Sequence, residues 1–132
     1  MEDSRLRWKG LKLLEEVKKA FLAFHYAEKI KTNLIVASTL LEFLGGLADA
    51  EVAGAEKLLI AYFNALIMEV NIAANASQIE GFRDIAAKLN EAIEQTGQHN
   101  YANAERRISE AISIATTHGS RAAQTLKDKG LI

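Results

Sequence analysis

The chain contains no cysteine and no proline among its 132 residues. Without cysteine there is no disulfide, no thiolate metal ligand and no thiol nucleophile, so the redox compartment is left open and a cytoplasmic setting is the default expectation. Without proline, only glycine interrupts a helix, and the eight glycines stand mostly where helices are expected to end. These absences favour a protein built from long, unbroken helices.

An excess of charge of either sign is also missing. The chain has 16 Lys and Arg against 17 Asp and Glu, a formal net charge of −1, which argues against a strongly basic nucleic-acid module. With 49% hydrophobic and 25% charged residues, the composition is that of a folded protein and excludes disorder. The length fits a single domain covering residues 1–132. The first residues lack the apolar stretch of a signal peptide, which agrees with a cytoplasmic location.

Apolar residues recur at steps of three, four or seven, and this spacing predicts an all-helical protein. The first helix is expected to run from a cap at Asp3 or Ser4 to the glycine pair at positions 45 and 46. At about 60 Å it exceeds its successors, so it either overhangs the rest of the protein or breaks near Lys31 to Asn33. Continuity is favoured because no glycine or proline marks a break.

Three further helices follow, joined by short connections. Short connections make antiparallel neighbours the simplest arrangement, so the predicted fold is an all-α, antiparallel up-down four-helix bundle with a long first helix. The second helix is expected to begin after a cap at Asp49 and to end near Asn75. The third is expected to open with a capping box from Ser77 to Glu80 and to end at Gly97. The fourth is expected to follow a cap at Asn100, with Gly130 just past its end.

The second helix is more apolar than one core contact requires. Between Leu58 and Ile79 it carries a single charged side chain, Glu69. A surface helix needs an apolar stripe of roughly 100°, so a wider stripe implies a second buried surface, most simply supplied by another copy of the chain. Self-association as a dimer or higher oligomer is therefore predicted. The predicted interface residues are Leu59, Tyr62, Phe63, Leu66, Ile67 and Val70.

The same stretch approaches the length of a bilayer span. Asn64, Glu69 and Asn71 oppose insertion, since an acidic side chain near the centre of a span alone costs about 2.5–3.5 kcal/mol. No membrane partner is expected. If Glu69 is buried it needs a partner from the first or fourth helix, and the alternative is a ligand-binding carboxylate.

Charge is segregated along the chain although the total is close to zero. Residues 1–31 hold eight basic and five acidic side chains, residues 32–98 three and nine, and residues 99–132 five and three. The favoured interpretation is complementary charge between neighbouring helix faces. The alternative is a nucleic-acid surface made by Arg106 and Arg107 together with the basic first helix.

No catalytic or metal-binding motif accompanies these helices. There is no G-x-S-x-G, glycine-rich phosphate loop or H-E-x-x-H, and His25 with Glu28 does not extend to the di-iron pattern of helical bundles. No catalytic residue, metal or cofactor is predicted. The expected function is that of a non-enzymatic structural or adaptor subunit that forms homo-oligomers. The alternative is a module that binds a small ligand between helices near Glu69, or nucleic acid through its basic first and last helices.

Overall fold

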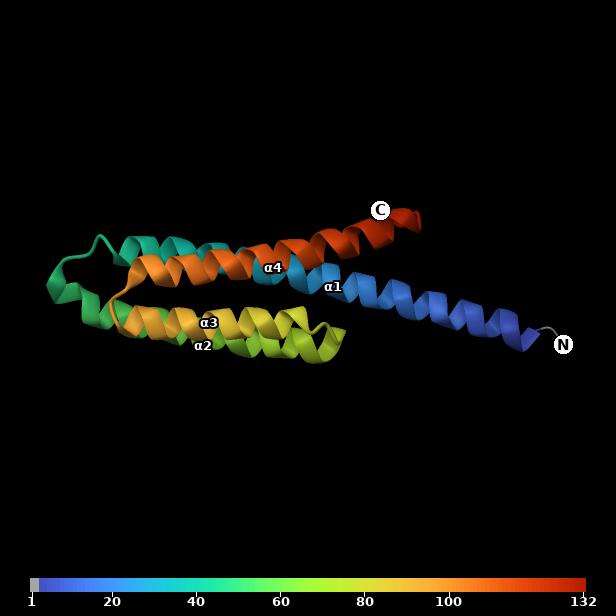
Figure 1. Cartoon of the computed structure of the whole chain (residues 1–132), viewed down its shortest axis with the longest axis horizontal. Coiled ribbons are helices and arrows are strands. Elements are labelled where there is room, and N and C mark those ends of the chain that lie inside the picture. The colour runs from blue at the N-terminus through green and yellow to red at the C-terminus, as the bar shows by residue number, and fades with distance from the viewer. Residues whose placement is uncertain (1–2) are drawn as a thin grey trace.

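The computed structural model describes residues 3–132, and this part of the chain forms four α-helices and no strand. Figure 1 shows the helices lying alongside one another, with the first part of the chain projecting beyond the others. The expectation of an all-helical fold with four packed helices is confirmed. In chain order the helices are α1 (Asp3–Leu44), α2 (Asp49–Ser77), α3 (Gly81–Gly97) and α4 (Tyr101–Asp128).

The four helices pack in a ring. α1 contacts α2 and α4, and α3 also contacts α2 and α4, whereas no contact joins the two diagonal pairs within the described residues. The interface between α1 and α4 is the most extensive of the four, and that between α1 and α2 is the least. The seam between α1 and α2 is therefore the least tightly closed side of the bundle.

α1 contributes to the core through a seven-residue repeat. Ala20, Ala27, Leu34 and Leu41 are all buried, and each is followed three residues later by another buried apolar side chain. This is the a and d spacing by which coiled-coil helices pack into one another. The repeat keeps one face of α1 turned toward its neighbours through six helical turns.

Small side chains let α4 lie close to α1. A Cβ atom added to Gly119 would lie 3.4 Å from the Cβ of Ala27, so a larger side chain at that position has little space. The two helix backbones therefore approach closely at this point. The inner face of α4 is formed by Ala104, Ile108, Ala111, Ala115, Ala122 and Leu126, which are buried, and by the half-buried Ile112.

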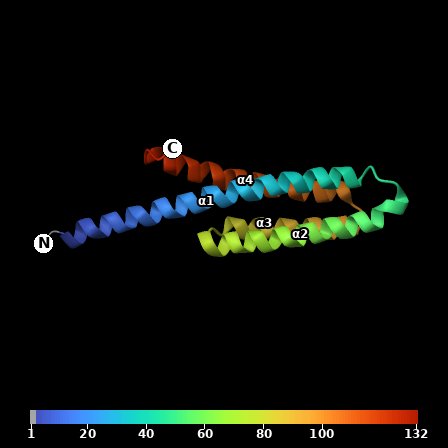
Figure 2. The ribbon, with the colours of Figure 1, turned by 180° about the vertical axis from the view of Figure 1, so that it is seen from behind.

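α1 is one unbroken helix of 42 residues, so the alternative of a break between Lys31 and Asn33 is wrong. Its first buried side chain is Ala20, and from residue 4 to residue 19 every side chain is exposed except the half-buried Val17. We call residues 4–19 the overhang. Figure 2 shows it extending past the connection between α2 and α3, as the length of the helix predicts.

Two of the predicted caps differ in detail. α2 is preceded by Ala48 as its N-cap, so Asp49 is already the first helical residue, and Asn100 occupies the N-cap position of α4 without a side-chain hydrogen bond to the helix. The carboxylate of Asp49 still lies at the positive end of the helix dipole. Ser4 lies inside α1, and a cap preceding Asp3 falls outside the described residues.

The predicted capping box from Ser77 to Glu80 is wrong. Ser77 is the last residue of α2, because Gln78 takes a left-handed backbone conformation with φ of 60° and donates its N–H to the carbonyl of Ala74. α3 then begins three residues later than expected, at Gly81, with Glu80 in place of Ser77 as its N-cap. The Ser77 hydroxyl donates to the carbonyl of Ala73 at 2.7 Å and accepts the N–H of Ile79 at 3.3 Å.

Replacing Ser77 with Ala should lower the free energy of unfolding by about 1 kcal/mol, because the buried hydroxyl makes two hydrogen bonds and one of them holds the N–H of Ile79. Equilibrium unfolding in urea measures the change. Ser109→Ala, at an exposed position of α4, is the matched control and should leave the midpoint in place. Equal midpoints for both variants and the parent would contradict a stabilising role for this turn.

Candidate interaction surface

The predicted interface residues of α2 mostly face the chain's own core. Leu59, Phe63, Leu66 and Val70 are at most 5% exposed, and Tyr62 and Ile67 are half-buried against the same core. The four buried residues are not accessible to a second copy while the bundle is folded, so their assignment to an intermolecular surface needs correction. Tyr62 and Ile67 keep part of their surface exposed.

A different stripe of α2 faces outward. Leu58, Ala61, Ala65, Met68 and Ile72 follow one another at steps of three and four, which places them on one side of the helix. The large members are well exposed, Leu58 by 75%, Met68 by 67% and Ile72 by 60%. α2 thus has an apolar inner face and an apolar outer face. The excess apolar width seen in the sequence is real, although it lies on the other side of the helix.

α1 extends this outer stripe across the seam between the two helices. Val36, Leu40 and Phe43 are 43%, 42% and 70% exposed. Leu40, Phe43, Leu58 and Tyr62 belong to the wall of a groove of about 630 Å³, whose lining side chains are all apolar or aromatic. We call the combined surface the apolar face. Its members are Val36, Leu40 and Phe43 of α1 with Leu58, Ala61, Ala65, Met68 and Ile72 of α2.

Glu69 lies at the edge of the apolar face and has partners on α1. Both of its carboxylate oxygens accept hydrogen bonds from the side-chain amide of Asn33 at 3.2 Å, and the Lys29 ammonium lies 3.5 Å away. The Tyr62 hydroxyl donates to the Asn33 carbonyl at 3.1 Å, and burial together with the nearby Glu69 charge raises the pKa of Tyr62. These contacts account for the carboxylate as a link between α1 and α2.

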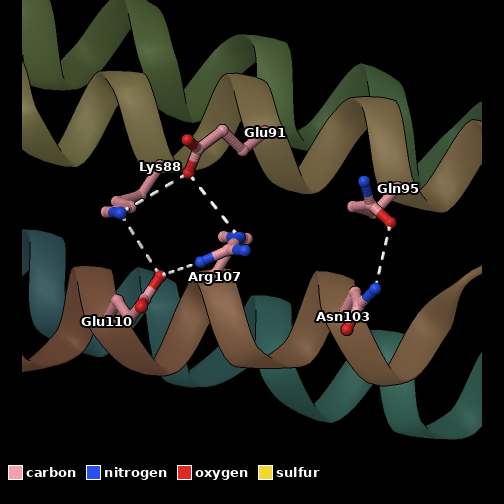
Figure 3. A network of polar contacts seen from close by, with 6 residues as sticks. All are labelled: Lys88, Glu91, Gln95, Asn103, Arg107 and Glu110. Atoms are coloured by element: carbon pink, nitrogen blue, oxygen red, sulfur yellow. Dashed lines mark hydrogen bonds and ion pairs between the residues drawn. The ribbon is translucent and has the colours of Figure 1, made fainter.

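Arg107 is engaged in a charge network between α3 and α4 (Figure 3). Its guanidinium donates to Glu110 at 2.8 Å and lies 3.7 Å from Glu91, while Lys88 lies 3.3 Å from Glu110 and 3.6 Å from Glu91. The hydrogen bond from Arg107 is the main reason why the pKa of Glu110 is lowered. Complementary charge between helix faces, the favoured sequence interpretation, describes this network.

Arg106 and Arg107 do not join the basic residues of the overhang in one patch. Lys129, just past the end of α4, contacts Glu16 of the overhang at 3.1 Å, so the C-terminal end of α4 lies beside the overhang. Arg107 lies 22 residues earlier, about 33 Å away along the helix. That separation exceeds the Debye length of about 8 Å at physiological salt, so the exposed Arg106 and its neighbour act independently of the overhang.

A buried carboxylate that the sequence interpretation missed sits at the other end of the bundle. Glu56 of α2 is 7% exposed, accepts a hydrogen bond from the Tyr101 hydroxyl and lies 2.5 Å from Nδ1 of His99. Burial disfavours its charged form, but the hydrogen bonds from Tyr101 and His99 outweigh burial and hold the pKa of Glu56 below its ordinary value. Burial and then the bond to Glu56 raise the pKa of Tyr101 to about 12.

This Glu56 cluster fastens the connection between α3 and α4 to α2. His99 has a left-handed backbone with φ of 62°, an unusual conformation for a residue other than glycine. Its imidazole is 69% exposed on one side and holds Glu56 on the other. His99 and Tyr101 also line a hollow of about 370 Å³ at this end of the bundle. The Glu56 cluster is thus a set of polar contacts that joins the connection between α3 and α4 to the first turns of α2.

The remaining histidines, His25 and His118, lie on different helices. His25 is exposed, with its ring 5.2 Å from that of Tyr26, and His118 packs against Phe82 and over Gly81. Burial and the neighbouring Arg121 lower the pKa of His118, while Asp84 opposes them. Across residues 3–132 no group of three or more His, Asp or Glu side chains is arranged to hold a metal ion.

No protein family, curated protein or solved structure matches this chain. Among the described helices α2 is long and apolar enough to cross a membrane, a test of length and composition that the core helix of a soluble protein also passes. A function has to be inferred from the surface of the bundle itself, where the apolar face is the most distinctive feature.

Glu56→Gln should lower the free energy of unfolding near neutral pH, and this loss should shrink in acid. The folded pKa is lowered from 4.5, so the stabilisation by ionised Glu56 is present above pH 4.5 and disappears as the pH falls through the lower folded value. Urea unfolding of parent and variant from pH 7 to about pH 3 measures the difference between their free energies of unfolding. The control Glu15→Gln, at an exposed position away from either end of α1, should show no such pH-dependent difference. A difference in unfolding free energy between parent and variant that stays constant into acid would contradict a stabilising role for ionised Glu56.

We expect no measurable binding to mixed-sequence RNA or DNA at physiological salt, because Arg107 is already paired with carboxylates and lies far from the basic overhang. Fluorescence anisotropy with single- and double-stranded oligonucleotides tests this expectation. A dissociation constant below about 10 μM that rises when Arg106 and Arg107 are both changed to Ala would instead favour a nucleic-acid module.

Proposed function

We propose that this protein is a non-enzymatic structural or adaptor subunit whose apolar face binds other proteins, including further copies of the chain. The contiguity of the apolar face supports the proposal. Leu58, Phe43, Met68 and Ile72 are each at least 60% exposed, and they lie on one side of the α1 and α2 pair. Scattered exposed hydrophobic residues are normal on soluble proteins, whereas a contiguous patch beside an apolar groove is typical of an interaction surface.

The proposal includes an antiparallel up-down arrangement of the four helices. The order of the contacts supports it, since residue numbers rise along one helix as they fall along its neighbour. On α1 and α4, Ala27 lies near Gly119 while Glu16 pairs with Lys129. On α3 and α4, Glu91 lies near Arg107 and Gln95 contacts Asn103. A rod of this kind exposes its outer helix faces along their full length to partners.

A cytoplasmic setting and the absence of membrane-spanning or nucleic-acid contacts complete the proposal. The inner face of α2 is packed in the core through Phe63 and Val70, which are fully buried, and its seam with α1 carries the Glu69 contacts. Crossing a bilayer would require α2 to leave both sets of contacts. A face of moderate apolar area beside a polar rim is better suited to another protein surface.

A module that binds a small apolar ligand is the second candidate. The groove of about 630 Å³ lies within the size range of ligand sites, roughly 300–1,000 Å³, and its lining is apolar. Its walls lack the convergent polar groups that orient most small ligands. The adaptor role is therefore the better supported of the two.

Leu58→Lys should abolish self-association with little effect on folding, because the side chain is 75% exposed and its replacement places a charge beside the groove of the apolar face. Light scattering over a range of micromolar concentrations measures the change, and circular dichroism checks that the helices are retained. The matched control is Leu131→Lys, an exposed apolar position past the end of α4. A parent protein that stays monomeric at every concentration would contradict self-association.

A further inference from the structure

The overhang is a second unpartnered surface, at the opposite end of the rod from the groove. Leu6 is 68% exposed, Leu14 66%, Leu11 53% and Leu13 49%. The seven-residue core repeat of Ala20, Ala27 and Leu34 continues backward onto Leu13 and Leu6, so the overhang has the pattern of a packed helix without a neighbour. Such a pattern indicates that another helix surface covers it.

The overhang is also strongly basic. Residues 4–19 hold six basic side chains and two acidic ones, a formal charge of 6 − 2 = +4. Leu6, Leu13, Leu14 and Val17 fall on one side of the helix, while Arg5, Lys9, Lys12 and Lys19 fall on the adjoining and opposite sides. Its partner should therefore combine an apolar floor with acidic edges.

The apolar face of this same protein has that combination. Exposed side chains next to the groove in the sequence include Glu42, Asp49 and Glu51 against a single base, Lys57. The outer stripe from Leu58 to Ile72 spans 14 residues, about 21 Å, and the 16 residues of the overhang span about 24 Å. Charge, polarity and length are thus complementary between the two surfaces.

The overhang cannot reach the groove of its own chain. The overhang and the α1 part of the apolar face lie on the same unbroken helix. Lys19 at the end of the overhang and Leu40 in the groove are 21 residues apart, about 31 Å along that helix. We propose that the overhang of one copy docks as a helix on the apolar face of a second copy, so that the protein assembles head to tail. The proposal rests on the apolar face being an interaction surface.

Head-to-tail contact leaves one free overhang and one free apolar face on every open assembly. Because the two surfaces differ, the contact is heterologous and does not close after two copies unless a rotation forms a ring. Assembly should therefore grow with concentration. It should also weaken as salt is added, since charge attraction between exposed groups is screened.

A lipid surface is the alternative occupant for a basic helix of this kind. Trp8 and Leu11 lie on the side of the overhang away from Leu6 and Leu13, so apolar side chains are not confined to one face as in helices that lie flat on a bilayer. Glu15 and Glu16 also lie in the overhang, where they would face anionic headgroups. These features favour a protein surface.

The test mixes two assembly-deficient variants. Leu58→Lys has a damaged apolar face and an intact overhang, whereas the double variant Leu6→Gln and Leu13→Gln has an intact face and a damaged overhang. Each alone should be monomeric, with an apparent dissociation constant at least about tenfold above that of the parent. An equimolar mixture has one intact pair of surfaces and should give a 1:1 dimer and no longer species in light scattering.

Trp8→Gln is the matched control on the overhang, because Trp8 is 67% exposed but lies on the other side of the helix from Leu6. It should assemble like the parent. Association of the Leu6→Gln and Leu13→Gln variant at parental strength would overturn the head-to-tail inference while leaving self-association through the apolar face intact. Two variants that stay monomeric when mixed would also overturn it.

Sedimentation with phosphatidylserine vesicles separates the lipid alternative. The parent and the double overhang variant should both stay in the supernatant at physiological salt. Parental binding to these vesicles that the double variant loses, with assembly unchanged, would show that the overhang docks on lipid and would overturn the inference.

Discussion

The unequal length of the four helices is the constraint on which the rest of the structure depends. α1 has 42 residues and α3 has 17, so a complete ring of four helices extends only as far as the shortest member. Beyond the connection between α2 and α3, the core face of α1 loses α2 as a neighbour. α4 covers it as far as Glu16, where Lys129 makes an ion pair, and the remainder of α1 stands free. The overhang follows directly from this mismatch.

Close packing against α4 holds α1 in the bundle although its first part has no neighbouring helix. Ala20, Ala23 and Ala27 on α1 face Gly119 and Ala122 on α4, and all five are buried. With side chains this small the two backbones approach closely, which increases the dispersion contacts along the interface. The interface between α1 and α2 has larger side chains at its rim and remains open as a groove. The side of α1 toward α4 is thus closely packed, whereas the side toward α2 carries the open apolar groove.

The helices and most of their ends could be predicted from the sequence because glycine and apolar spacing mark them directly. The side of α2 that packs in the core could not. Leu59, Phe63, Leu66, Val70 and Ala73 form one stripe, and Leu58, Ala61, Ala65, Met68 and Ile72 form another with the same spacing, shifted along the helix. Apolar periodicity alone cannot show which of two equally regular stripes packs in the core. The bulk of Phe63 and Val70 against the small Ala61 and Ala65 is the one signal that favours the first as core.

The Glu56 cluster was beyond sequence reasoning for a different reason. Glu56 and His99 are 43 residues apart, and they meet only because α3 and its connection return to the start of α2. The left-handed backbone of His99, which brings its ring over Glu56, has no signature in a run of Gly97, Gln98, His99 and Asn100 that predicts only a turn. Contacts of this kind depend on topology, which local pattern does not encode.

The distribution of charge gives the near-zero net charge of the chain a physical meaning. A rod with the same charge at both ends would repel its own copies when they meet end to end, whatever apolar surface they carry. Here the overhang carries a formal charge of +4, while Glu42, Asp49 and Glu51 outnumber Lys57 in the sequence next to the groove, within a total of −1. A low total charge reduces the general repulsion between copies of a protein, and separated signs favour contact between unlike ends. In the proposed contact, burial of apolar surface would supply the affinity, because exposed ion pairs alone contribute little.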